Sequence, residues 1–427
     1  MIRKNTIVLI TSCSLILLLI TMAFVTMDKE VDLPATGFEE RESVDWTTLD
    51  EEIEFVKKIA ELSDRVWYEE VGQSVEGLPI YMAFVGEHVR NDEEVRNGRT
   101  IFIMGTPHGN EPAGREAALK LLRDLAFTED PTMLEILEKS TVLIMPTASP
   151  DSRMADSRTN AMDINVNRDH LNLETPEAQT TAKIMRDYKP DIFVDAHERV
   201  AETPDIEYLW PRNLNMDKEL YALNRELVEE YLMPDAIEAG WTTGVYGSPG
   251  DVGREDERIL RNMGGLRHSI TILTESTRSK SHAERVAMQL NSFYSVLRFY
   301  HEKFDEIASA VDGAPLRKQA DGKNKANFYL EGADDEPERE RIINPAVCGY
   351  LLHPKQAKQI ERHIELFDLE TEQVGEEAVF VTMGQPMMTV IPLLMDDRAN
   401  YNEVSGLPMT DCTNLDIVDF KTELSAD

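Results

Sequence analysis

Short apolar runs alternate with longer helical patterns through much of the chain. The apolar, β-branched runs predict strands, which we place at Thr100–Gly105, Thr141–Pro146, Asp191–Ala196 and Ser269–Thr274. The helical patterns around them predict helices at Leu49–Val66, at Ala113–Leu125, from Thr175 onward and at Ser281–Phe304. Alternation of this kind indicates an α/β fold, with a mixed, largely parallel sheet flanked by helices over residues 49–311.

The rest of the chain predicts a second, smaller unit. Residues 312–340 are polar and charged with scattered Gly and Pro, which indicates a linker. The segment that follows, residues 341–427, is predicted to form a small α+β or β-rich C-terminal domain. Its predicted strands are Ala346–Leu352 and Ala378–Val381, its predicted helix is Gln356–Phe367, and Gln385–Leu394 is a further apolar run.

The first thirty residues indicate where the protein is located. Arg3 and Lys4 precede an uncharged run, residues 6–27, which is long enough to cross a bilayer as one helix and is followed by acidic residues. This order of charges places the N-terminus inside the cell and the rest outside. We therefore interpret residues 1–30 as a membrane anchor or signal peptide and residues 31–48 as a linker. The expected location is the extracellular side of the cell membrane, or the medium if the segment is cleaved.

The charge balance and the cysteines narrow the possible functions. The chain has 79 Asp and Glu residues against 44 Lys and Arg, a formal net charge of −35. A surface this negative argues against nucleic acid or anionic lipid as a partner, so we expect membrane contact through the N-terminal segment only. Cys13 lies in the apolar run, which leaves Cys348 and Cys412 able to pair in an exported protein. The sequence has no Cys-x-x-Cys motif, so a thiolate zinc site is excluded.

Two segments that follow predicted strands carry candidate metal ligands. His108 and Glu111 stand three residues apart in a glycine-containing turn between a strand and a helix, and another predicted strand ends at His197. In α/β sheets the reacting groups gather at the carboxyl ends of the strands. Zinc in hydrolases takes three His and carboxylate ligands and keeps one position for water. The sequence therefore predicts a zinc site with these three ligands, in which Asp195 or Glu198 accepts a hydrogen bond from a ligand histidine.

Two arginines and a late glutamate are further candidates for chemistry. Arg158 and Arg168 stand ten residues apart in a segment rich in Asn and Asp that has no amphipathic pattern. Arginine suits a carboxylate or a developing oxyanion, although simple ion pairing in an acidic chain is an equal alternative. Glu275 ends the last predicted strand, where a buried carboxylate beside a metal-bound water can act as a general base. The alternative is a solvated glutamate.

The order and spacing of these residues resemble the zinc metallocarboxypeptidases (carboxypeptidase A-like peptidases) over residues 50–305. The resemblance implies a carboxypeptidase-like fold in which the three predicted ligands bind Zn²⁺. It further implies that Arg158 polarises the scissile carbonyl, that Asn167 and Arg168 hold the terminal carboxylate of the substrate, and that Glu275 is the general base. Tyr246, 29 residues before that glutamate, is the candidate for the family's substrate-capping tyrosine, at a wider spacing than is usual.

The resemblance implies a zinc-dependent exopeptidase that removes C-terminal residues from peptides with a free carboxylate, and the N-terminal segment implies that it is exported. Asn165 stands where many members have an apolar or acidic residue, and we expect it to weaken the positioning of its neighbours. One alternative is an N-acyl amino acid deacylase of the aspartoacylase or desuccinylase kind, which also has His-Gly-Asn-Glu and an Asn-Arg pair. A cell-wall peptide hydrolase is another. An inactive surface binding protein is a third, but it would be expected to lose site residues that this chain keeps.

Overall fold

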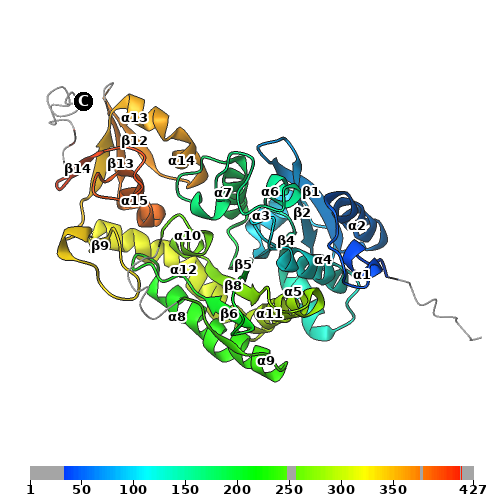
Figure 1. Ribbon diagram of the computed structural model, residues 1–427. Helices are drawn as coiled ribbons and strands as arrows, with labels where there is room; N and C mark the ends of the chain where they lie inside the picture. Colours follow the sequence, from blue (N-terminus) through cyan, green and yellow to red (C-terminus); the bar gives the residue numbers. More distant parts are fainter. Residues whose placement is uncertain (1–32, 248–255, 376–377, 414, 416–427) are drawn as a thin grey trace, which may run out of the picture. The chain divides into compact units, whose positions relative to one another are not determined.

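The described part of the chain begins after the apolar N-terminal segment. The computed structural model describes residues 33–247, 256–375, 378–413 and 415 (Figure 1). The predicted membrane anchor or signal peptide, residues 1–30, lies outside the described residues. Among the residues that are described, no helix combines the length and the apolar character needed to cross a membrane.

An eight-stranded sheet forms the centre of the fold, in the order β1-β2-β4-β3-β5-β8-β6-β7 (Figure 1). The central strands β4, β3, β5 and β8 run parallel, whereas β2 and β6 join them antiparallel. The four predicted strands correspond to β3, β4, β5 and β8, so the predicted mixed, largely parallel sheet is confirmed. The strands are β1 Val66–Gln73, β2 Pro79–Val85, β3 Arg99–Met104, β4 Ser140–Met145, β5 Ile192–Arg199, β6 Ile206–Leu209, β7 Thr243–Val245 and β8 Ile270–Thr277.

Helices cover both faces of this sheet because side chains alternate between the faces along each strand. In β3, Ile101 and Ile103 face a core shared with α2, α4 and α11, whereas Phe102 and Met104 face a second core shared with α7. The helices are α2 Leu49–Leu62, α3 Asp92–Asn97, α4 Ala113–Ala126, α5 Pro131–Lys139, α6 Pro150–Met154, α7 Pro176–Tyr188, α8 Lys218–Glu226, α9 Met233–Glu238, α10 Leu260–Leu266 and α11 His282–Glu302; a π-helix, Leu227–Leu232, joins α8 to α9.

The capping residues explain where the predicted helices begin. Thr175 is the N-cap of α7 and accepts a hydrogen bond from the Ala178 amide, while Ser281 forms a capping box with Glu284 at α11. The predicted N-terminal helix, in contrast, ends at Leu62, because the chain turns there into strand β1.

The segment predicted as the first linker, residues 31–48, is folded where the structure describes it. It contains α1 Gly37–Glu40, in which Phe38 is buried and stacks on Trp46 with 5.1 Å between ring centroids. Two isolated aromatic residues in an acidic stretch give no periodic signal, yet their burial is enough to dock the segment on the core.

The second predicted linker, residues 312–340, is also wrong over its first part. Helix α12, Phe304–Lys323, runs across the predicted boundary and continues through Pro315. Its polar composition indicated a linker, but Ala310 and Ala314 bury one side of the helix against the main core. A helix with one narrow buried stripe is polar on average, which explains the error.

Beyond α12 the chain forms a small β-rich unit. Its four-stranded sheet has the order β12-β13-β11-β14, and β9 pairs with β10. Cys348 and Cys412, which the sequence left able to pair, form a disulfide. The single predicted helix is divided in two at Ile360. The elements are β9 Phe328–Tyr329, β10 Ile342–Ile343, β11 Gly349–Leu352, β12 Thr371–Val374, β13 Ala378–Thr382, β14 Leu407–Met409, α13 Pro354–Gln359, α14 Glu361–Leu366, a 3₁₀ turn Pro386–Thr389 and α15 Ile391–Met395.

This C-terminal unit shares a hydrophobic core with the sheet domain. Val166, Leu171 and Leu266 of the sheet domain belong to the same buried cluster as Tyr350 and Leu394 of the C-terminal unit. Residues 35–427 accordingly form one compact unit. The predicted border between two domains therefore does not separate two independent cores.

Candidate active site

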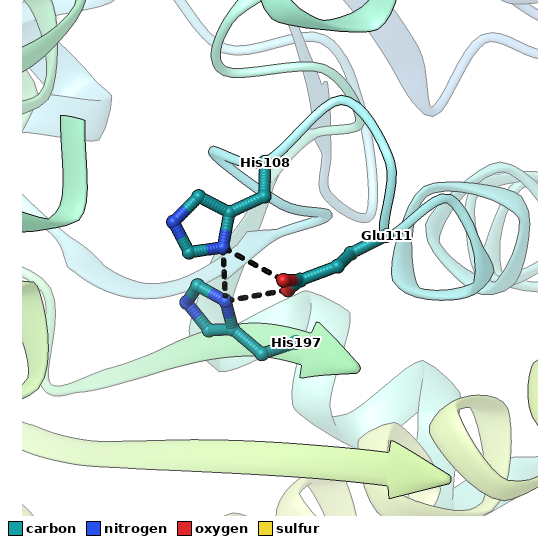
Figure 2. A group of neighbouring side chains, drawn as sticks. All are labelled: His108, Glu111 and His197. Carbon is teal, nitrogen blue, oxygen red and sulfur yellow. Dashed lines mark hydrogen bonds and ion pairs between the residues drawn. The ribbon is translucent and has the colours of Figure 1, made fainter. Parts of the chain in front are cut away.

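Three parallel strands deliver the candidate residues to one edge of the sheet. His108 and Glu111 lie in the loop that joins β3 to α4, and His197 lies near the carboxyl end of β5 (Figure 2). Glu275 is paired in register with His197 across β5 and β8. The carboxyl ends of neighbouring parallel strands meet at one edge, so residues more than 160 positions apart come together.

Glycines make the tight turn of the β3–α4 loop possible. A Cβ atom at Gly109 would lie 1.8 Å from the backbone oxygen of Ser152, and one at Gly114 would lie 2.3 Å from that of Gly105. The backbones therefore pack more closely there than any side chain would permit. Inside the turn, the Glu111 amide donates to the His108 carbonyl oxygen at 3.1 Å, which holds the two candidate ligands on the same side.

His108, Glu111 and His197 converge on one small buried volume. The Nδ1 atoms of the two histidines are 3.1 Å apart, and the Glu111 oxygens lie 3.1 Å from that of His108 and 2.9 Å from that of His197 (Figure 2). All three residues are at most 3% exposed. Two imidazole nitrogens and a carboxylate directed at one point are the donor set that zinc prefers, and these residues fit a zinc ion.

Each histidine is held at its other ring nitrogen. Nε2 of His108 lies 2.9 Å from the side-chain oxygen of Asn165, which can only accept, so that nitrogen carries the proton and Nδ1 is free for a metal. Nε2 of His197 lies 2.8 Å from Asp195 Oδ1. Of the two acceptors predicted from sequence, Asp195 contacts the histidine. Glu198 instead accepts from the Ala113 amide and from Arg285.

Electrostatics within this group favour a bound cation. Burial would raise the pKa of Glu111, but its close contacts with the imidazoles of His108 and His197 hold it below its ordinary value. Burial lowers the pKa of His108. For His197, burial is outweighed by Asp195 and Glu111, which raise its pKa well above the ordinary value. A metal ion would take the place of that proton beside the ionised Glu111.

Glu275 lies inside strand β8 rather than at its end, since the strand continues to Thr277. The side chain is 7% exposed, and its Oε2 atom has no hydrogen-bond partner in the described part of the chain. Burial raises its pKa to about 8, against the lowering effect of His197. A buried carboxylate with one unsatisfied oxygen is not the solvated glutamate considered as the alternative.

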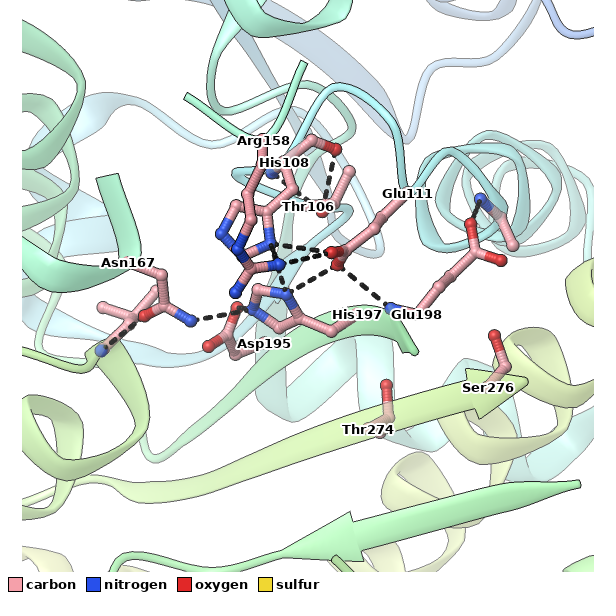
Figure 3. A network of polar contacts seen from close by, with 12 residues as sticks. Thr106, His108, Glu111, Arg158, Asn167, Asp195, His197, Glu198, Thr274 and Ser276 are labelled. Carbon is pink, nitrogen blue, oxygen red and sulfur yellow. Dashed lines mark hydrogen bonds and ion pairs between the residues drawn. The ribbon is translucent and has the colours of Figure 1, made fainter. Parts of the chain in front are cut away.

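Arg158 points into the group of metal ligands. Its Nη1 atom lies 2.8 Å from Glu111 Oε1 and 3.2 Å from His108 Nδ1 (Figure 3). The side chain is 51% exposed, so the guanidinium lies between the buried ligands and solvent. This is the position from which a cation can stabilise an oxyanion formed above the metal.

The Asn167–Arg168 pair is divided between two environments. Asn167 is 4% exposed; its Oδ1 accepts from the Leu260 amide at 2.9 Å, and its Nδ2 lies 3.1 Å from His197 Nε2 (Figure 3). Nε2 of His197 faces the Asp195 carboxylate at 2.8 Å and carries a proton there, so the Nδ2 donor group of Asn167 is not satisfied by it. The role of Asn167 in holding the substrate carboxylate stays a prediction. Arg168 is 39% exposed and remains accessible to a substrate.

Tyr246 lies close to the same centre. It follows β7, and its amide donates to the Tyr208 carbonyl oxygen at 2.8 Å. Burial, followed by the charge of Glu275, raises the pKa of the Tyr246 hydroxyl to about 12. The charge of Glu275 thus influences this hydroxyl, and the role of Tyr246 as the substrate-capping tyrosine stays a prediction.

Comparisons with known proteins agree with this geometry. Residues 53–207, which include every candidate metal ligand, match the family described as zinc carboxypeptidase. Carboxypeptidase 2 of Trichophyton rubrum is 28% identical over 389 residues, covering 84% of this chain and 69% of that protein. Carboxypeptidase E of Caenorhabditis elegans is 24% identical over 243 residues, 51% of this chain and 50% of that protein. The resemblance to the zinc carboxypeptidases predicted from sequence is thus confirmed over residues 53–207.

The solved structure of a metallo-carboxypeptidase from Burkholderia cenocepacia is similar in fold. The match covers 60% of this chain and 69% of that chain, with a TM-score of 0.50 and 16% identity. The match of residues 53–207 and the curated relatives indicate a hydrolase with zinc as its cofactor, and the His-Glu-His group is where the zinc fits.

Sequence reasoning missed some groups around the candidate active site. Asp256 lies 3.5 Å from Arg168, and Arg258 stacks on Tyr401 of the C-terminal unit. The local signal is a mixed run of acidic and basic residues around residue 256, which by itself indicates no partner. A contact between residues 143 positions apart leaves no trace in local periodicity.

Proposed function

We propose that this protein is an exported exopeptidase that removes the C-terminal residue of peptides. The observation that carries the proposal is the placement of Glu275. It is a buried carboxylate with an unsatisfied oxygen, held in register beside the metal ligand His197. A general base placed next to a zinc site is the arrangement that peptide hydrolysis by an activated water requires.

Zinc, when bound to His108, Glu111 and His197, would supply a Lewis acid that lowers the pKa of a water toward neutrality. Glu275 takes one proton from that water, whose oxygen forms a bond to the carbonyl carbon of the last peptide bond. Arg158 donates hydrogen bonds to the negative carbonyl oxygen that results. The bond from carbon to nitrogen then breaks, and Glu275 returns its proton to the leaving amine. The products are a shortened peptide and a free amino acid.

Arg168 accounts for the restriction to chain ends. Its exposed guanidinium can form paired hydrogen bonds with a carboxylate, which only the last residue of a peptide carries on its main chain. Asn167, whose Oδ1 accepts from the Leu260 amide, would share the substrate carboxylate through its Nδ2 group. Tyr246 would cover the bound substrate.

The proposed location outside the cytoplasm rests on two features. The N-terminal sequence has basic residues before an uncharged run and acidic residues after it. The disulfide between Cys348 and Cys412 fits an oxidising compartment. Cell fractionation followed by labelling of free thiols tests this: we expect protein outside the cytoplasm in which these two cysteines resist alkylation. Recovery of the reduced protein in the cytoplasm would contradict it.

The activity is tested by incubating the purified full-length chain with matched peptides that end in a free carboxylate or an amide. We expect mass spectrometry to show loss of one C-terminal residue from the free peptides only, and a zinc chelator to stop the reaction. N-acetyl and N-succinyl amino acids are included as competing substrates. Release of acyl groups without any shortening of peptides would favour a deacylase and reject the proposal.

A further inference from the structure

The C-terminal unit contacts Arg258, which shares a carboxylate with Arg168. Tyr401, which follows α15, lies under the guanidinium of Arg258, whose Cζ is 3.6 Å from the ring centroid. The same segment is bound to the loop that follows Arg168. In that loop, Asn172 Nδ2 donates to the Tyr401 carbonyl oxygen at 3.3 Å and to Glu403 at 2.6 Å. Tyr401 is therefore anchored to the sheet domain through its backbone and stacks on it through its ring.

Arg258 in turn holds the carboxylate of Asp256 by hydrogen bonds to both of its oxygens. Its Nε and Nη2 atoms bind the two oxygens of Asp256 at 3.0 and 2.9 Å, and its backbone amide also donates to Asp256 at 3.0 Å. Arg168 is left with a longer contact, 3.5 Å from Nε to Asp256 Oδ2. Asp256 is thus shared by two arginines, and the paired contact belongs to Arg258.

This sharing matters because Asp256 and a substrate carboxylate compete for the guanidinium of Arg168. Arg168 also donates from Nη1 to the Asn167 carbonyl oxygen at 2.7 Å, so its orientation is already restricted. If Arg258 were absent, the full charge of Asp256 would turn toward Arg168, and an incoming carboxylate would have to displace it.

We propose that Tyr401 and Arg258 are positioning residues that keep Asp256 paired, so that Arg168 remains available to the C-terminal carboxylate of a peptide. The inference rests on the proposed function of Arg168 and gives the C-terminal unit a part in substrate binding. Tyr401 acts through Arg258, and Arg258 acts through Asp256; neither needs to touch the substrate.

Binding of peptides to the zinc-loaded Glu275→Gln protein tests the inference without depending on turnover. Calorimetry with a peptide that has a free C-terminus should show Kd about tenfold higher after Arg258→Ala and about threefold higher after Tyr401→Ala. Tyr401→Phe keeps the ring and should bind like the parent protein. The amidated form of the same peptide should show no difference among the variants.

The double variant Asp256→Asn, Arg258→Ala separates this mechanism from a general loss of structure. Removing the rival charge should restore Kd to within about threefold of the parent, whereas a damaged fold would not be repaired. Arg398→Ala is the matched control, because Arg398 binds both oxygens of Asp396 at 2.8 and 2.9 Å with the same spacing in sequence. It should leave Kd unchanged.

Two results would overturn the inference: an unchanged Kd after Arg258→Ala, or a double variant as weak as the single one. Either can occur while the wild-type protein still shortens peptides, in which case the proposed function stands. A wild-type protein that shortens no peptide would reject the function, yet the binding measurements would still decide whether Arg258 protects Arg168.

Discussion

The two ligand histidines present the same nitrogen, Nδ1, to Glu111, but different partners hold them. His108 faces the neutral amide oxygen of Asn165, whereas His197 faces the carboxylate of Asp195. We expected Asn165 to weaken the positioning of its neighbours. Instead its oxygen also accepts from the Asn167 backbone amide at 3.0 Å. One side chain therefore orients the ligand His108 and fixes the backbone just before Arg168. A neutral acceptor supplies orientation without adding negative charge to the site.

Glu275→Gln is expected to keep zinc and lose turnover. The amide preserves the shape of the side chain but cannot take a proton from water, so kcat should fall by about 100-fold or more. Elemental analysis measures the zinc content, and peptide hydrolysis at saturating substrate measures kcat. A variant that cleaves at close to the wild-type rate would show that another group is the base.

Glu257 is expected to make stability depend on pH. It is 3% exposed, its Oε1 has no partner among the described residues, and burial raises its pKa to about 7 from 4.5. The folded state therefore prefers the protonated acid. The stability that Glu257 contributes is fully present below pH 4.5 and is lost as the pH rises through 7, by up to about 3 kcal/mol.

Glu257→Gln removes this titration while keeping the size of the side chain. The difference in Tm between variant and wild type should therefore grow in favour of the variant between pH 5 and pH 8. Thermal melts monitored by circular dichroism at both pH values measure it. A difference in Tm that does not change with pH would contradict the raised pKa.

At the scale of elements, the sequence predicted what lies in continuous apolar runs. Strands β3, β4, β5 and β8 are buried on both faces, so their composition alone revealed them and, with them, the edge where the ligands gather. The β1–β2 hairpin was missed because β1 is half exposed and interrupted by a bulge near Glu70. Docking of α1 and α12 depends on distant partners, which local periodicity does not record.

Two glycines of different elements should respond to alanine by very different amounts. At Gly109 the new Cβ would meet the Ser152 backbone oxygen at 1.8 Å, so we expect loss of several kcal/mol of stability and of zinc. At Gly313, inside α12, the new Cβ would lie 2.3 Å from Arg317 Nη1, in a guanidinium that Asp217 and Glu219 hold. Displacing that side chain offsets the gain in helix propensity, so Gly313→Ala should change stability by less than about 1 kcal/mol and leave zinc binding intact. Urea titration and zinc analysis of both proteins check this. Equal zinc content in the two variants would contradict the proposed role of the turn.

At the scale of the whole molecule, the disulfide closes a long loop in the C-terminal unit. Cys348 and Cys412 are 64 residues apart, and removing such a link costs up to about 4 kcal/mol in the chain-entropy account. Cys412→Ser should therefore lower Tm by several degrees in the absence of reductant, and wild-type protein treated with reductant should melt like the variant. Cys13→Ser is the control and should melt like wild type. Identical melting of oxidised and reduced protein would show that the link adds no stability.

Val166 lies at the point where the two parts of the molecule meet. It is buried in the core shared with the C-terminal unit, while its neighbours Asn165 and Asn167 contact the two ligand histidines. Exchange of the C-terminal unit between relatives would therefore change the packing around Val166. Through Asn165 and Asn167 it would alter the positions of the ligand histidines, although no residue of the catalytic centre had changed. The C-terminal unit and the sheet domain are therefore expected to change together in evolution. A chimaera with another C-terminal unit would need a residue at position 166 that packs against that unit.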